Sequence, residues 1–155
     1  MSEVAMVQPT NKLVVDSTNL HVQTKVVETV ANCFPGRMVA RGTGDHDVLV
    51  CAAAGHGYGW LGYEHTDKLN RPATVNTIYL VNANAAIING AGIILVGCAA
   101  AGATITKGER LTMAAAGMLT PAVVGTDDVV AIAEESITTA AGDTSGTDIL
   151  VRSVI

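Results

Sequence analysis

The sequence predicts an all-β fold, a compact antiparallel β-barrel or β-tulip-like domain with an extended N-terminal arm. Residues 105–155 alternate short apolar runs with single turns, a pattern typical of several short strands. Hydrophobic residues make up 49% of the chain and aromatic residues only 3%, so the core must consist of Val, Ile, Leu and Ala. β-Branched side chains favour pleated surfaces, and no segment carries a long amphipathic helical pattern.

The chain divides into an arm at residues 1–19 and a single β-domain at residues 20–155. Residues 1–11 are polar, mixed in character and without periodicity, which indicates a terminal extension. The remaining length is enough for one domain with its own core.

The first predicted strand follows the arm. Leu20, Val22, Thr24 and Val26 alternate with polar residues, so they should share the buried face of a half-buried strand. A turn is expected at Pro35-Gly36. Further strands are expected at residues 37–41, 47–52 and 74–81.

Two buried strands are predicted next, followed by the C-terminal strands. Asn89-Gly90 lies between Ile87-Ile88 and Ile93-Ile94, which is a strong signal for a hairpin turn. Residues 106–110 should form a polar β-turn with Gly108 in the tight position.

The same region allows an alternative interpretation as a membrane segment. Residues 72–106 carry no charge, and residues 85–103 approach the roughly 20 apolar residues that a spanning helix needs. Asn84, Asn89 and several glycines interrupt this stretch, and no basic or aromatic flank anchors it. We therefore expect buried strands and no membrane partner.

A glycine-rich aromatic segment lies in the middle of the chain. Gly-Tyr-Gly-Trp-Leu-Gly at 57–62 matches the dinucleotide pattern G-x-G-x-x-G, but the following residues form a poor helix and end at Pro72. The acidic residue expected about 20 positions later is absent. Tyr58, Trp60 and Tyr63 form either a small core cluster or an anchor in a subunit interface.

Histidines and cysteines are the candidates for chemistry. His46, His56 and His65 lack the spacing of a metal site, and Cys51 has no visible orienting group or oxyanion hole. We expect no metal, no cofactor and no enzymatic activity. The alternative is a small-molecule-binding or catalytic β-barrel that uses His46, His56, His65 or Cys51.

The charge distribution argues against nucleic-acid binding. The net charge is −5, and the nine basic residues are scattered rather than clustered, whereas a nucleic-acid binder must neutralise phosphates. Charged residues make up only 15% of the chain, which indicates a surface partly covered by copies or partners.

Several turn-and-strand motifs resemble the capsid cement, or head decoration, proteins of tailed phages and related viruses. The similarity is strongest over the last third of the chain. The Gly-rich aromatic stretch at 55–63 is not typical of that family. The motifs are Phe-Pro-Gly-Arg-Met-Val at 34–39, Ile-Thr-Lys-Gly-Glu-Arg-Leu-Thr at 105–112, Met-Ala-Ala-Ala-Gly-Met-Leu at 113–119, Val-Val-Ala-Ile-Ala-Glu-Glu at 129–135 and Asp-Ile-Leu-Val-Arg-Ser-Val at 148–154.

The resemblance implies a protein of the virion, made in the host cytoplasm and bound to the outer capsid surface. Its implied partners are the major capsid protein and further copies of itself, often as a homotrimer. Its implied role is to bridge neighbouring capsid proteins of the expanded head, with the arm reaching a neighbour. The candidate interface residues are Val4, Met6, Val7, Leu13, Tyr58, Trp60 and Tyr63.

Overall fold

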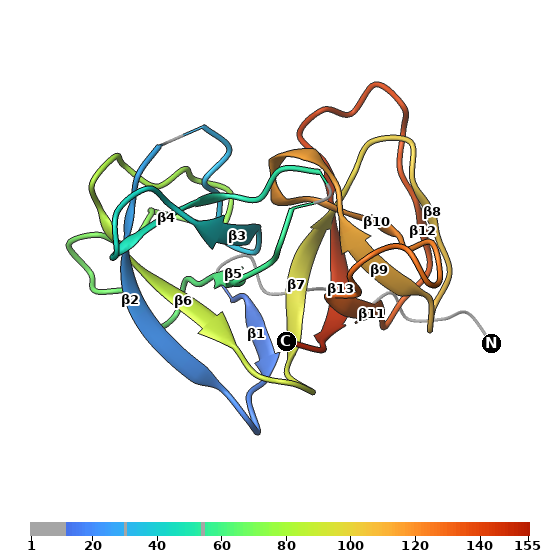
Figure 1. Ribbon diagram of the computed structural model, residues 1–155, viewed down its shortest axis with the longest axis horizontal. Helices are drawn as coiled ribbons and strands as arrows, with labels where there is room; N and C mark the ends of the chain where they lie inside the picture. Colours follow the sequence, from blue (N-terminus) through green and yellow to red (C-terminus); the bar gives the residue numbers. More distant parts are fainter. Residues whose placement is uncertain (1–11, 30, 54) are drawn as a thin grey trace.

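Two β-barrels lie side by side in the computed structural model, which describes residues 12–29, 31–53 and 55–155 (Figure 1). The prediction of an all-β barrel fold is confirmed. Short strands with glycine at the turns build both barrels, and the one helical element among the described residues is the 3-10 turn η1 (Ala115–Gly117). No described helix is long and apolar enough to cross a membrane.

The first barrel closes in the strand order β2-β4-β3-β5-β6. β2 and β6 form its longest antiparallel pair, with six residue pairs from His21↔Asn89 to Val26↔Asn84. The strands are β2 (His21–Val27), β3 (Met38–Arg41), β4 (Asp47–Val50), β5 (Gly59–Leu61) and β6 (Asn84–Asn89).

The second barrel is closed by β7 and β13, which pair in antiparallel fashion over six residue pairs. A hairpin, β9–β10, and the antiparallel strand β11 complete its wall. The strands of this sheet are β1 (Val14–Asp16), β7 (Ile94–Ala99), β9 (Arg110–Met113), β10 (Leu119–Pro121), β11 (Ala131–Ala133) and β13 (Thr147–Ser153). A separate two-stranded sheet consists of β8 (Thr104–Ile105) and β12 (Ile137–Thr138).

Three strands of the first barrel form a wall that both barrels share. Along β3, β5 and β6, side chains alternate between the two apolar cores, as successive residues of a strand point to opposite faces. Val39, Leu61 and Ile87 fill the first barrel. Met38, Trp60 and Ile88 join the apolar cluster of the second barrel. Both faces of these strands are therefore buried, which explains the continuous apolar run of β6.

Glycine allows the close packing at this wall. A Cβ on Gly59 would lie 2.7 Å from Ile87 Cγ2, and one on Gly62 would lie 2.8 Å from the carbonyl oxygen of Ala86. The glycines of the G-x-G-x-x-G match thus make room for neighbouring strands rather than for a pyrophosphate.

The predicted hairpin at Asn89-Gly90 is wrong, although the two buried strands on either side of it are present. β6 pairs with β2 and β5, whereas β7 pairs with β1, β10 and β13. The Asn-Gly turn instead carries the chain from one barrel to the other. Gly90 has φ +145° and passes so close to Asn19 that a Cβ would lie 2.0 Å from its carbonyl oxygen.

Two other predictions, one strand and the burial of another, differ from the structure. Residues 74–81 form turns and irregular backbone rather than a strand. β2 is present, but it is not half-buried: residues 21–24 are exposed on both faces, with Val22 at 44%, and only Val27 at the end of the strand is buried. The strand lies on the outer side of the first barrel, so its apolar alternation has no second layer to pack against.

The C-terminal third follows the prediction closely. Gly108 has φ +85° in a turn closed by the Glu109 amide, which donates to the Thr106 carbonyl oxygen at 3.0 Å. Residues 113–119 form the β9–β10 hairpin, with Leu119 opposite Met113. The turn predicted at Pro35-Gly36 is also present, with Gly36 at φ +86°.

Part of the predicted arm belongs to the sheet. β1 pairs with β7, and Leu13 and Val14 are buried in the apolar cluster of the second barrel. Residues 1–11 lie outside the described part of the chain, so the arm function predicted for them stays a prediction.

Candidate functional site

The predicted interface residues occupy two kinds of position. Leu13, Trp60 and Tyr63 are 1%, 0% and 6% exposed. Their side chains face the chain's own core and present almost no surface to a partner, which corrects their assignment as interface residues. Tyr58 is half-buried at the surface. Val4, Met6 and Val7 lie outside the described residues.

Trp60 connects the two barrels. Its indole Nε1 donates a hydrogen bond to Ser153 Oγ on β13, at 3.0 Å and fully buried. Ser153 Oγ in turn donates to the carbonyl oxygen of Ile155 at 2.8 Å. A buried indole N–H needs such a partner. This hydrogen bond therefore fixes the position of β13 relative to the shared wall, within a contact that is otherwise apolar.

Arg37 makes a second connection across the joint. The side chain precedes β3, is 4% exposed, and donates from its two terminal nitrogens to the carbonyl oxygens of Ala116, at 2.8 Å, and Ser145, at 2.7 Å. Its guanidinium carbon lies 5.5 Å from the centre of the Phe34 ring. Both acceptors belong to the second barrel, so one cation ties two of its loops to the first barrel.

An open cavity of about 650 Å³ lies beside Arg37, between the two barrels. Burial raises the pKa of Asp148 at its edge, and the positive charge of Arg37 opposes that shift. Burial also raises the pKa of the Cys98 thiol to about 11, so at neutral pH the cavity holds a protonated thiol rather than a nucleophilic thiolate. Asp143 accepts hydrogen bonds from Ser145, a contact typical of a rigid polar turn.

The residues of the catalytic alternative are dispersed. His46 and His65 are exposed in separate loops of the first barrel. His56 lies 3.0 Å from Asp128, but both side chains are solvent-exposed. Cys51 is buried, and desolvation raises the pKa of its thiol. Within the described ranges, no three His, Cys, Asp or Glu side chains are placed to hold a metal ion together.

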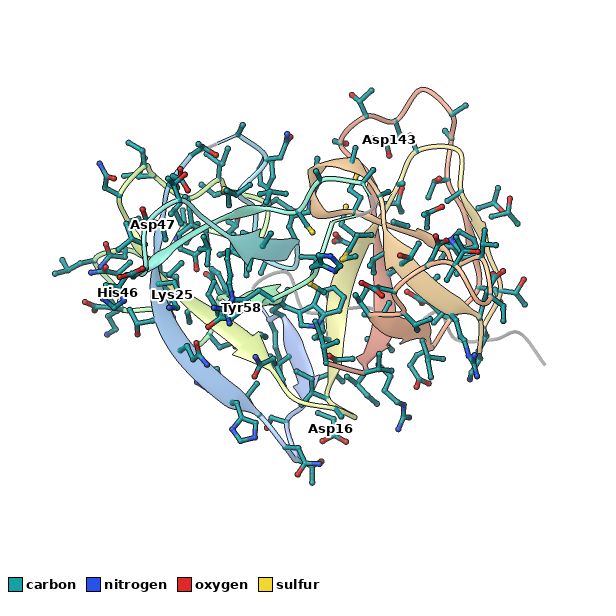
Figure 2. The ribbon with its side chains drawn as sticks, viewed as in Figure 1. Asp16, Lys25, His46, Asp47, Tyr58 and Asp143 are labelled. Atoms are coloured by element: carbon teal, nitrogen blue, oxygen red, sulfur yellow. The ribbon has the colours of Figure 1, made fainter. Side chains whose placement is uncertain are left out.

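A polar cluster on the first barrel has features of a binding surface (Figure 2). The Lys25 ammonium and the Arg41 guanidinium lie 5.8 Å and 5.0 Å from the centre of the Tyr58 ring. The Tyr58 hydroxyl donates to Gln23 Oε1 on β2. A cavity of about 180 Å³ lies among Lys25, Arg41, Tyr58 and the loop that follows β3. We call Gln23, Lys25, Arg41 and Tyr58 the Tyr58 cluster.

Sequence reasoning identified only Tyr58 in this cluster. Its other members come from β2 and β3 and are brought together by barrel closure, so no spacing rule could find them. Arg37 carried a local signal that could have been used: a cation directly before the buried pair Met38-Val39 must itself become buried and therefore needs partners.

Exposed apolar side chains form further surface features. Leu69 and Leu80 are 91% and 75% exposed on the loops between β5 and β6. Val123 and Val124 are 62% and 79% exposed in the turn between β10 and β11. That turn is held by Asp127, whose Oδ2 accepts from the Val123 amide at 2.8 Å.

Among solved structures, this chain is similar in fold to the N base of the head fiber gp8.5 of bacteriophage phi29. The TM-score is 0.57 at 14% sequence identity, over 86% of this chain and 93% of that chain. No protein-family model matches the sequence, and no curated protein does. The resemblance to capsid cement proteins therefore stays a prediction, whereas the fold shared with the head-fiber base is established.

Proposed function

We propose that this protein is a structural component of a phage head that binds the outer capsid surface and cements neighbouring major capsid proteins. The observation that carries the proposal is the fold shared with the phi29 head-fiber base over nearly the full length of both chains. The motifs of the last third, which resemble cement proteins, agree with it in kind. The proposed partners are the major capsid protein and two further copies of this chain in a trimer.

The physical character of the molecule supports this role. Two barrels joined by buried hydrogen bonds from Trp60 and Arg37 form a stiff body, which a bridge between capsid proteins requires. The net charge of −5 disfavours binding to packaged DNA. Weak contacts repeated over many capsid sites add up to firm attachment.

The likeness to a fiber base favours a second version of this function, in which the chain anchors a longer appendage to the head. The two versions differ in their effect on the particle. A cement protein raises the temperature at which heads rupture, whereas a fiber base leaves that temperature unchanged and is needed for the appendage to be visible.

The test uses heads of the phage that encodes this chain, made without it. Purified protein is added, and the heads are pelleted and assayed by quantitative gel and by thermal rupture. We expect saturable binding at a fixed ratio to the major capsid protein and a higher rupture temperature. Sedimentation of the free protein tests the trimer. Absence of binding to these heads would rule out both versions.

The catalytic alternative is tested with the variant His56→Ala. Because His56 and Asp128 are exposed to solvent, we expect no change in melting temperature and unchanged binding to heads. A substrate turned over by the wild-type protein and not by the variant would overturn the non-enzymatic proposal.

A further inference from the structure

The first barrel has an open strand edge. β2 pairs with β6 from His21 to Val26, but it pairs with β4 only at Val26 and Val27. In the described part of the chain, no strand pairs with the other edge of residues 21–25. Such an edge offers backbone donors and acceptors to an added strand.

The backbone groups on that edge follow from the hydrogen bonds at its end. The amides of Val26 and Glu28 donate toward β4, to His46 and Val48 at 2.8 Å and 3.0 Å. The amide of Val27 donates in the other direction, to Ala83 at 3.0 Å. Because backbone direction alternates along a strand, the amides and carbonyls of Val22 and Thr24 face the open edge, whereas those of Gln23 and Lys25 face β6.

The Tyr58 cluster borders this edge and carries two cations. Asp45 and Asp47 line the same cavity, but among the described residues neither Lys25 nor Arg41 lies within ion-pair distance of a carboxylate. Lys25 donates to the backbone oxygen of Asp45 at 3.2 Å. Two cations that lie beside one aromatic ring without an ion pair keep donors available for an incoming carboxylate, which would have to displace the weaker influence of Asp45 and Asp47.

We propose that the open edge of β2 receives an extended acidic segment of the partner protein. Its backbone pairs with Val22 and Thr24, and one of its carboxylates binds Lys25 and Arg41. This inference rests on the proposed function only in naming the capsid as the source of the segment. Main-chain pairing supplies affinity, and the two cations select acidic segments over basic ones.

The experiment uses the full chain and two probes: a short peptide of alternating glutamate and threonine, and the same peptide with lysine in place of glutamate. Amide hydrogen exchange is followed residue by residue by NMR. With the glutamate peptide at about ten times its Kd, exchange at Val22 and Thr24 slows about tenfold, because those amides are then exposed only in the free fraction. Gln23 and Lys25 are internal controls and stay unchanged, as they already bond to β6.

Variants separate charge from backbone pairing. The double variant Lys25→Gln/Arg41→Gln weakens the glutamate peptide about tenfold or more, the loss expected for charge-assisted bonds. The matched double variant Lys107→Gln/Arg110→Gln, which removes two exposed cations of the second barrel, leaves its affinity unchanged. Equal binding of both peptides, or slowing that spares Val22 and Thr24, would overturn the inference.

Binding to heads distinguishes this inference from the proposed function. Weaker head binding by the Lys25→Gln/Arg41→Gln variant, with the Lys107→Gln/Arg110→Gln variant unaffected, supports the capsid as source of the segment. If wild-type protein binds heads and the Lys25→Gln/Arg41→Gln variant binds equally well, the edge is not the docking site and the proposed function stands. If the glutamate peptide binds and heads do not, the edge remains a docking site and the capsid is not its partner.

Discussion

β2 and β6 pair along six residues, yet β6 is buried on both faces and the first four residues of β2 are exposed. The two strands differ in their distance from the second barrel. β6 belongs to the wall shared by both barrels, whereas β2 lies on the outer side of the first (Figure 1). Burial of a strand is thus set by its place between the barrels, and its own apolar pattern is a poor guide.

The shared wall should be the most sensitive part of the molecule. Replacing Trp60 with alanine removes a fully buried ring and its bond to Ser153. We expect a loss of about 3–5 kcal/mol in the free energy of unfolding. Urea unfolding, monitored by near-ultraviolet circular dichroism and by NMR, measures this loss. Both barrels should unfold in one transition, and separate transitions would contradict a shared wall.

A substitution at Arg37 tests the contact between the two barrels without opening a large cavity. In Arg37→Met the carbonyl oxygens of Ala116 and Ser145 lose their donors, which should cost about 2–4 kcal/mol. The matched change Arg152→Met, at an exposed pair with Glu134, should cost about 0–1 kcal/mol. Urea denaturation of the two variants gives the comparison, and equal losses would mean that the Arg37 contacts do not hold the barrels together.

Alkaline pH compares a thiol in the core of the first barrel with a buried thiol beside the cavity between the barrels. Burial raises the pKa of Cys33 in the first barrel and of Cys98 in the second to about 11, from an ordinary 9.0. Between these values the unfolded thiols lose protons that the folded ones keep, so stability is full below about pH 9 and falls as the pH rises toward about 11. Each thiol should contribute about 1–3 kcal/mol to the fall.

The measurement is urea unfolding under reducing conditions across this pH range. Cys33→Ala and Cys98→Ala should each flatten the decline by a similar amount. Burial also raises the pKa of the Cys51 thiol and raises that of Tyr79 to about 12, so the double variant should keep part of the decline above about pH 9. A double variant with the full wild-type decline would show that the thiols are not its cause.

The smallest change in stability should come from β2, on the outer side of the first barrel. Val22→Thr on β2 should change the free energy of unfolding by less than about 0.5 kcal/mol, because Val22 is 44% exposed. The matched change Val39→Thr on β3, at a side chain only 1% exposed, should cost about 1–3 kcal/mol. If the two variants lose equal free energy of unfolding, measured by heat or by urea, then β2 is half-buried as the sequence predicts.

The sequence predicted the second barrel better than the first, for a physical reason. Its C-terminal turns are local: Gly108 and the hairpin at residues 113–119 connect neighbouring strands, so short-range patterns suffice. The first barrel is organised by contacts distant in sequence. Asn89-Gly90 has the composition of a hairpin, but the strands on either side of it find partners elsewhere.

The candidate site was predicted only in part for the same reason. Tyr58 stood out as an aromatic residue among glycines, but Trp60 and Tyr63 in the same segment are core residues. Lys25 and Arg41 lie on strands that meet Tyr58 only after closure. The open edge of β2 depends on where β4 begins in space, which no residue of β2 encodes.

The passage between the barrels is fastened by residues near the C-terminus of the chain. The amides of Gly90 and Gly92 donate to the carbonyl oxygens of Ile155 and Ser153, at 2.7 Å and 2.8 Å. Both acceptors lie in or after β13, so they are synthesised after every strand of the first barrel. A nascent chain therefore lacks these two hydrogen bonds until β13 is in place, and the face of the shared wall that the second barrel later covers is the apolar surface that a chaperone would meet in that interval.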